Sequence, residues 1–297
     1  MKLSSKSVLA TAFMFCAIGG ASQVQAADTL AKIKSTGKIV IGHRESSDPI
    51  SYVVAGKPVG YAIDICNNVA NEIKKELKMP HLKVEYKAVT SSTRIPELLS
   101  GNIDMECGTT TNSIQRQQQV SFSTNYYATE VRMAVKAGSN IKSIADLNGK
   151  AVVTTQGTTS DKYIKMNEKG QAVNVQNVYG KDHADSFAML ASGRAAAFVM
   201  DDNILAGLIA KSSNPKAFAI VGPVLSSEPY GIMLPKGDTK FKAVADRVVV
   251  GMWKSGQMDN LYKKWFESPI PPKHTNLNMA PSSSFKKLKA RPTDAGI

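Results

Sequence analysis

Three arginines in this 297-residue chain follow or flank segments with strand character, and hydroxyl side chains lie beside them. Arg44 follows "KIVIGH", Arg94 lies in "VTSSTRIPE", and Arg116 ends "CGTTTNSIQR" after Thr109 and Thr111. In α/β folds, ligand-binding groups gather where strands end. A guanidinium can hold a carboxylate through two parallel charge-assisted hydrogen bonds. These residue types at this spacing therefore predict an anion site.

Other residues at strand ends add one acid and further polar groups. "FVMDD" ends a strand in Asp201 and Asp202, "GKDHADS" carries His183, and Ser91 precedes Arg94. "TQGTTSD" opens a helix, whose first N–H groups and positive dipole end suit an anion. A phosphate site would not favour an aspartate beside it. The set fits a small zwitterion with two carboxylates, which needs cations for both carboxylates and one acid with hydroxyls for its ammonium group.

Each of these residues also has an ordinary structural interpretation, and the sequence leaves these alternatives open. The arginines could form surface ion pairs or lie on solvated helix ends, and His183 could be structural. Asn112 could cap a helix in a capping box with Gln115. One of Asp201 and Asp202 could be the N-cap of "NILAGLIA".

Motifs of other function classes were not found. The sequence contains no G-x-S-x-G, H-E-x-x-H, Walker loop or strand-linked G-x-G-x-x-G motif. None of the four histidines has a second histidine or a cysteine four residues on. We therefore expect a protein that is not an enzyme, with no cofactor and no metal.

The first 26 residues have the pattern of a cleaved secretion signal. Lys2 and Lys6 precede the uncharged "VLATAFMFCAIGG", and "VQA" ends at Ala26. The apolar core is too short for a membrane-spanning helix of ~20 residues. Removing the signal lowers the formal charge from +13 to +11. The remaining lysines are scattered, so we expect no nucleic-acid partner, and "FKKLKARP" near the C-terminus is interpreted as a solvated tail.

Two cysteines remain in the exported chain, Cys66 and Cys107. An even count in an oxidising compartment favours one disulfide, with two buried free thiols as the alternative.

Strand-like and helix-like segments alternate along the chain, which favours α/β domains. We expect a helix over 60–77 after a strand start, strands over 82–89 and 103–107, and a short helix over 95–102. Strand and helix patterns recur over 150–202, where Gly193 ends a helix as Gly101 does in the first half. The sequence therefore predicts two similar lobes. Further segments are a turn-rich passage over 221–238 leading into the strand "YGIML", helices over 241–256 and 258–266, and a loosely ordered tail apart from "SSSFKKLK".

Several of these segments resemble one known family. "GYAIDICNNVA" resembles the signature of the family 3 extracellular solute-binding proteins of ABC importers. "SSTRIPELLSGNIDMECGTTTNSIQRQQQVSFS", "ADLNGKAVVTTQGTTS", "KDHADSFAMLASGRAAAFVMDD" and "KWFESPIPP" resemble its glutamate/aspartate-binding periplasmic members. The resemblance covers nearly the whole mature chain in the same order.

The resemblance implies a type II periplasmic-binding-protein fold, with two α/β lobes, two hinge-crossing strands and a ligand cleft. It implies lobe 1 over residues 27–126 and lobe 2 over 127–225. Residues 226–297 would return to lobe 1 and end in the tail. The partners would be L-glutamate or L-aspartate and an inner-membrane ABC permease, and the protein would be a periplasmic monomer.

The resemblance also implies a role for each candidate residue. Arg116 would hold the α-carboxylate with Thr111 and the backbone at Thr159, and Asp201 would hold the ammonium with Thr109. The side-chain carboxylate would be held by four residues, which are Arg44, Ser91, Arg94 and His183. The alternatives are glutamine or asparagine as ligand, or a periplasmic dehydratase on the same fold.

Overall fold

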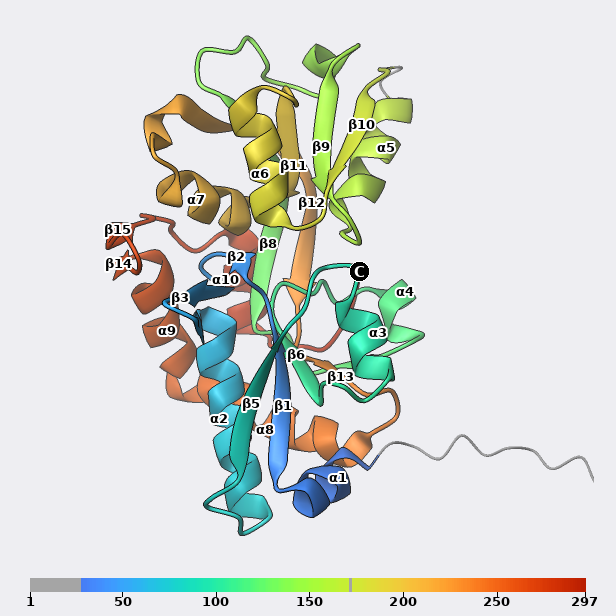
Figure 1. Ribbon diagram of the computed structural model, residues 1–297, viewed down its shortest axis with the longest axis vertical. Helices are drawn as coiled ribbons and strands as arrows, with labels where there is room; N and C mark the ends of the chain where they lie inside the picture. The colour runs from blue at the N-terminus through green and yellow to red at the C-terminus, as the bar shows by residue number, and fades with distance from the viewer. Residues whose placement is uncertain (1–27, 171–172) are drawn as a thin grey trace, which may run out of the picture.

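The computed structural model describes residues 28–170 and 173–297, which form two α/β lobes (Figure 1). The predicted signal peptide over residues 1–26 lies outside the described residues. Each lobe is built on one five-stranded sheet. The predicted lobe divisions after residues 126 and 225 fall at the start of β8 and inside β12, and both stay predictions.

The lobe 1 sheet mixes parallel and antiparallel strands. Its central strand β1 pairs in parallel with β5 and β6, and β13 joins β6 to β7 with antiparallel pairing. In spatial order the strands are β5 (Lys83–Ala88), β1 (Lys38–His43), β6 (Met105–Cys107), β13 (Met233–Leu234) and β7 (Ser121–Phe122). Small two- and three-stranded sheets flank this lobe, made of β2 (Ser46–Ser47), β3 (Ser51–Val54) and β4 (Lys57–Val59), and of β14 (Pro269–Ile270) and β15 (Thr275–Asn276).

The lobe 2 sheet contains the two strands that cross between the lobes. In spatial order its strands are β10 (Gln176–Gly180), β9 (Ala151–Thr155), β11 (Ala197–Asp201), β8 (Tyr127–Lys136) and β12 (Phe218–Tyr230). Strands β8 and β12 run antiparallel from lobe 2 into lobe 1 (Figure 1). The predicted turn-rich passage over 221–238 is wrong for most of its length, because β12 continues to Tyr230 across a register shift between Val221 and Ser226.

Helices cover both faces of each sheet. Lobe 1 carries α1 (Thr29–Thr36), α2 (Tyr61–Glu76), α3 (Arg94–Leu99), α4 (Ile114–Gln117), α8 (Thr239–Ser255), α9 (Gln257–Phe266) and α10 (Ser283–Ala290). Lobe 2 carries α5 (Ser160–Gly170), α6 (His183–Ser192) and α7 (Asp202–Lys211), with the short 3-10 turns η1 (Ala145–Leu147) and η2 (Pro215–Ala217). The predicted helices are found at these positions. The one difference is that α2 begins at Tyr61, without the strand start that was predicted at the beginning of residues 60–77.

Alternating apolar residues of the strands face two separate cores in each lobe. In β1, Ile39 and Ile41 belong to the large core beneath α2 and α8, whereas Val40 contacts the smaller core on the opposite face. In β11, Val199 and Phe198 divide between the two faces of the lobe 2 sheet in the same way. Burial on both faces explains why these strands read as continuous apolar runs.

A disulfide joins helix α2 to the end of β6. Cys66 and Cys107 are bonded, with their Cα atoms 6.3 Å apart, so the alternative of two free thiols is wrong. Cys107 precedes Gly108 and Thr109, so the bridge holds the strand end from which the predicted anion loop departs.

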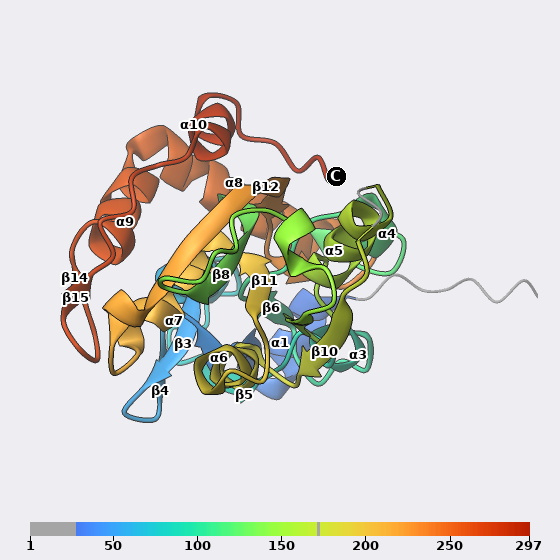
Figure 2. The same ribbon diagram turned by 90° about the horizontal axis from the view of Figure 1, so that it is seen from above.

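The tail was predicted to be loosely ordered apart from one helix, and only the helix is confirmed. Helix α10 turns Phe285 and Leu288 inward, with 2% and 8% of their surfaces exposed, and Phe285 packs on Tyr127 and Tyr262. Its lysines face outward, so "FKKLKARP" is an amphipathic helix end and not a solvated tail. Figure 2 shows α10 beside α9 and α8, with the chain then running back toward α4.

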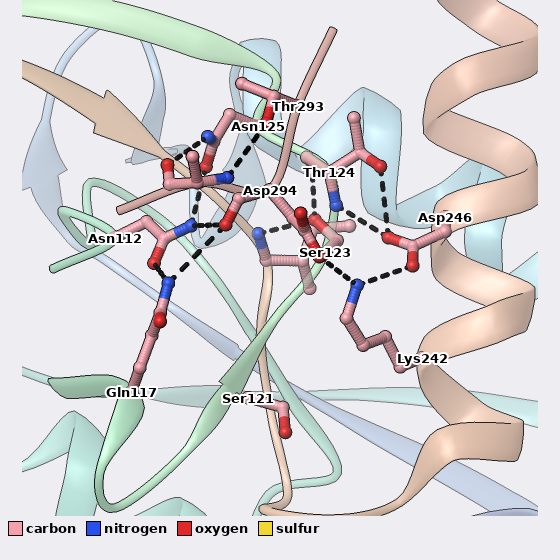
Figure 3. Close-up of polar contacts among 12 residues, drawn as sticks. Asn112, Gln117, Ser121, Ser123, Thr124, Asn125, Lys242, Asp246, Thr293 and Asp294 are labelled. Atoms are coloured by element: carbon pink, nitrogen blue, oxygen red, sulfur yellow. Dashed lines mark hydrogen bonds and ion pairs between the residues drawn. The ribbon is translucent and has the colours of Figure 1, made fainter. Parts of the chain in front are cut away.

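Residues 291–297, called the C-terminal strap here, are bound along lobe 1 (Figure 3). The buried Asn112 amide donates to the Asp294 carbonyl oxygen (2.9 Å), and the buried Asn125 amide donates to that of Ala295 (2.9 Å). Ile297 exchanges backbone hydrogen bonds with Asn112 and Ile114. The predicted helix cap at Asn112 is therefore wrong: Asn112 binds the strap, and Ser113 caps α4 through its hydroxyl.

A chain ending at Ala290 is expected to lose about 2–4 kcal/mol of unfolding free energy, because removal of the strap takes away the Ala295 acceptor of the Asn125 amide and one of the two acceptors of the Asn112 amide. Urea unfolding measures this. Asp294→Asn is the matched control, since it keeps the carbonyl acceptors and removes only the half-exposed ion pair with Lys242, and it should cost less than about 1 kcal/mol. Equal stability of the truncated and full chains would contradict the prediction.

Candidate ligand-binding cleft

The predicted site residues meet around one small cavity between the lobes. The cavity is lined by Ser91, Arg94, Thr109, Thr111, Thr158, Thr159, His183, Met200 and Asp201. Seven of the nine predicted residues line it. The other two, Arg44 and Arg116, contact lining residues directly. The carboxyl ends of strands in both sheets face this cavity, which is why residues far apart in sequence gather there.

Arg44 and His183 form one end of the site, from opposite lobes. Arg44 is 1% exposed; its Nε donates to the Val89 carbonyl oxygen (3.0 Å) and its Nη1 to Thr109 Oγ1 (3.3 Å). Its Nη2 lies 3.4 Å from His183 Nε2. Because arginine only donates, His183 Nε2 accepts, and its Nδ1–H donates to Thr155 Oγ1 (2.9 Å). Burial, and next the charge of Arg44, lower the pKa of His183 well below its usual value, so this imidazole is neutral.

Arg94 is held by backbone and by a buried acid that the sequence analysis missed. Its Nη1 donates to the Thr109 carbonyl oxygen (3.1 Å) and to Thr110 Oγ1 (2.7 Å), and Thr110 in turn donates to Glu106 Oε2 (2.6 Å). Glu106 lies between Met105 and Cys107 in β6 and is fully buried. An acid flanked by apolar residues in a buried strand was the available signal. Arg94 thus has structural partners, the Thr109 carbonyl oxygen and Thr110, and it also lines the cavity.

Arg116 connects the lobes at the other end of the site. Its Nη1 donates to the Thr111 carbonyl oxygen (3.0 Å) in lobe 1, and its Nη2 to the Gly157 carbonyl oxygen (3.2 Å) in lobe 2. Gly157 has φ +78°, and a Cβ there would lie 2.7 Å from the Ser91 carbonyl oxygen. Only glycine allows this close approach of the two lobes.

The pKa values show what charge each end of the site lacks. Burial, and next the charge of Arg94, lower the pKa of Arg44 to about 10 and that of Arg116 to about 9. Burial, and next the charge of Glu228, raise the pKa of Asp201 to about 8. An added anion would relieve the arginines, and an added cation would relieve Asp201. A ligand carrying both charges satisfies both requirements.

Asp201 occupies the N-cap position of α7, but its side chain makes no capping bond. Its Oδ2 accepts from the Tyr230 hydroxyl, and its Oδ1 is buried without a hydrogen-bond partner among the described residues. Asp202 turns the other way and accepts from Thr129 Oγ1 (2.7 Å) and from the backbone of Glu130 and Asn203. The open Oδ1 of Asp201 is an acceptor that faces the cavity. Ser91 Oγ is likewise buried without a partner in the described part of the chain.

Glu228 of β12 is a second buried acid that the sequence analysis missed. Its Oε2 accepts from the hydroxyls of Thr111 and Thr159, the latter at 2.7 Å. It lies in "SSEPY", which was interpreted as turn-rich. Its position in a strand beside the cleft was therefore not predicted. Each threonine has a single hydroxyl hydrogen, and both hydrogens point at Glu228. The hydroxyls therefore cannot donate to a ligand carboxylate while Glu228 is ionised.

The described residues lack two further kinds of feature, a metal-binding cluster and a membrane-spanning helix. No group of three or more His, Cys, Asp or Glu side chains is placed to hold a metal ion. None of the helices there combines the length and apolar character needed to cross a bilayer.

Known proteins with the same features were found at both the sequence and the structure level. A model of the bacterial extracellular solute-binding proteins, family 3, matches residues 39–268. The L-glutamate/L-aspartate-binding protein of Pseudomonas aeruginosa is 47% identical over 268 residues, covering 90% of this chain and 89% of that protein. The glutamate/aspartate import solute-binding protein of Escherichia coli is 44% identical, covering 92% and 90%.

A solved structure shows the same two-lobed architecture. A mutant of ArgBP from T. maritima superposes with a TM-score of 0.72 at 29% identity, covering 80% of this chain and 99% of that one. The predicted two-lobed α/β fold is therefore confirmed.

Proposed function

The chain belongs to the bacterial extracellular solute-binding proteins of family 3, and we propose that its cleft binds L-glutamate and L-aspartate for delivery to an inner-membrane ABC importer. The observation that carries the proposal is the meeting of three arginines with Asp201 around one small cavity. The curated relatives are transport binding proteins, and this chain is a binding protein and not an enzyme. We place it in the periplasm as a monomer.

Each part of the ligand has a set of partners in the proposed complex. Arg116, with the backbone at Thr111 and Thr159, binds the α-carboxylate, since the first N–H groups of α5 have no helical acceptors. Asp201, with Thr109, binds the ammonium. The side-chain carboxylate is bound by four residues from the two lobes: Arg44, Ser91, Arg94 and His183.

Ligand-driven closure follows from the division of these partners between the lobes. Arg44, Arg94 and Arg116 belong to lobe 1, whereas His183 and Asp201 belong to lobe 2. A ligand that contacts both lobes stabilises the closed form over an open one by its difference in affinity for the two. A few charged hydrogen bonds of about 1.5–3 kcal/mol each are enough for micromolar binding, about −8 kcal/mol.

Glutamine or asparagine would be the second candidates, because an amide also fits hydroxyls and a neutral histidine. An amide brings no negative charge to Arg44, whose pKa is already lowered by burial and by Arg94. The acidic amino acids are therefore favoured.

Calorimetric titration of refolded, ligand-stripped protein with glutamate, aspartate, glutamine, asparagine and succinate tests the function. We expect micromolar or tighter binding of glutamate and aspartate alone. Preference for an amide would overturn the assignment of Arg44, and binding of none of the five would overturn the ligand class.

Glutamate binding is also expected to depend on pH. The empty site holds a proton on Asp201 below its pKa of about 8, and the ligand ammonium favours the ionised form, so binding releases this proton. Affinity should rise about tenfold per unit as the pH approaches 8 and level off above it. Titrations in buffers of different ionisation enthalpy at pH 7 should detect release of close to one proton. A flat affinity from about pH 6 to 8 would contradict this linkage.

A further inference from the structure

Glu228 is a buried acid at the base of the cleft that no step of the proposed binding uses directly. It lies on the hinge strand β12 and is 0% exposed. Its Oε2 accepts one hydroxyl from each lobe, Thr111 before α4 and Thr159 before α5, whereas its Oε1 has no hydrogen-bond partner among the described residues. A buried carboxylate with an open oxygen is costly unless a cation or further donors complete it.

The direction of the two threonine hydroxyls follows from the chemistry of the carboxylate. An ionised carboxylate only accepts hydrogen bonds, so both threonines donate to Glu228. Each threonine oxygen then has only lone pairs left for a molecule in the cavity that both residues line. Lone pairs match the N–H groups of an ammonium and oppose the oxygens of a carboxylate.

The charges around Glu228 lead to the same ligand group. Asp201, whose Oδ1 is also open, lies close enough for the two carboxylates to repel each other. Arg116 interacts with both carboxylates, but it is already shared by the carbonyl oxygens of Thr111 and Gly157. A second positive charge with several N–H donors would satisfy this part of the cavity, and the amino group of an amino acid supplies both.

We propose that Glu228 is a positioning residue that makes the site select amino acids over the corresponding dicarboxylates without an amino group. It acts by fixing the hydroxyl hydrogens of Thr111 and Thr159, so that their oxygens accept from the ammonium that Asp201 holds directly. This inference rests on the proposed binding of acidic amino acids and adds the origin of their α-amino requirement. It also gives the threonine hydroxyls a different role from the α-carboxylate contact first implied for Thr111.

Glu228→Gln tests the proposal in the full chain, with L-glutamate and glutarate, its analogue without the amino group, as the two ligands. The side-chain amide of glutamine can donate to a threonine oxygen, which frees that hydroxyl hydrogen for a ligand carboxylate. We expect glutamate affinity to fall about 10- to 100-fold, as for loss of a charged hydrogen-bond partner, while glutarate affinity stays or rises. The ratio of the two affinities, measured by calorimetry, should shrink at least tenfold.

Glu130→Gln is the matched control, because Glu130 lies on the neighbouring strand β8 opposite Ser227, next to Glu228 in the register. Its affinity ratio should equal that of the unsubstituted protein. Thr159→Val removes one of the two hydroxyls without changing the carboxylate, and it should weaken glutamate more than glutarate even if Glu228→Gln does not fold.

Equal losses for both ligands in Glu228→Gln and in Thr159→Val would overturn the inference, because a purely structural role would change both affinities alike. Failure of the unsubstituted protein to bind glutamate or aspartate would instead overturn the proposed function. The two failures are therefore separate results of the same titrations.

Discussion

Replacing Arg116 with alanine is expected to abolish binding of glutamate and aspartate alike. Arg116 reaches carbonyl oxygens of both lobes and is the proposed partner of the α-carboxylate, which every amino acid carries. Removing one partner of a buried charge pair costs about 2–5 kcal/mol, or roughly 30- to 5,000-fold in affinity. Calorimetric titration with glutamate, aspartate and glutamine measures the loss, which should be similar for all three.

Arg247→Ala is the control for loss of a positive charge without loss of the site. Arg247 lies on α8 at the surface, where it pairs with Glu72 and Glu76, and about half of its side chain is exposed. Its replacement should leave all three affinities within about twofold, since surface ion pairs contribute little. Retention of tight glutamate binding by a folded Arg116→Ala protein would contradict the assignment of the α-carboxylate to this residue.

Replacing Arg44 with methionine is expected to change which ligand is preferred. Methionine keeps much of the length of the side chain and removes the charge between Thr109 and His183. Glutamate should bind about 10- to 100-fold more weakly, as for loss of a charged hydrogen bond, whereas glutamine should lose less or gain. The measurement is the ratio of glutamate to glutamine affinity in the variant and in the unsubstituted protein.

Arg94 does not offer an equally clean test, although the resemblance implies the same role for it. Its guanidinium also holds the Thr109 carbonyl oxygen and Thr110, which binds the buried Glu106. Its removal would break the chain of hydrogen bonds through Thr110 to the buried Glu106 and would lower stability along with affinity. A loss in Arg44→Met that is equal for glutamate and glutamine would show that Arg44 does not face the side chain of the ligand.

The positions of Arg44, Ser91, Thr109, His183 and Asp201 could be predicted because strand ends are a local property of the sequence. Strands in one sheet present their carboxyl ends at one edge, so a residue just past a strand is placed without knowledge of distant contacts. The apolar runs of β1 and β11 identified those strands for the same reason. These five residues, from both lobes, follow from this single rule.

Glu106, Glu228 and the strap could not be predicted in the same way, because their roles depend on distant partners. Glu228 meets Thr111 from 117 positions away, and Asn112 meets Asp294 from 182 positions away. Asn112 had an adequate local explanation as a helix cap, which the long-range contact with the strap replaced. The preference of a residue for a local role, such as helix capping, is overridden where a tertiary contact satisfies the same polar group better.

The order of strands in lobe 1 has a consequence for how the chain folds during synthesis. Strand β13, at residues 233–234, lies between β6 and β7, which come more than a hundred residues earlier. Until it arrives, β6 and β7 have no partner on their facing sides, and such open strand edges favour association with other chains. The strands and helices of lobe 2 come between β7 and β13 in the sequence. During synthesis lobe 1 therefore stays incomplete until residues 233–234 are available.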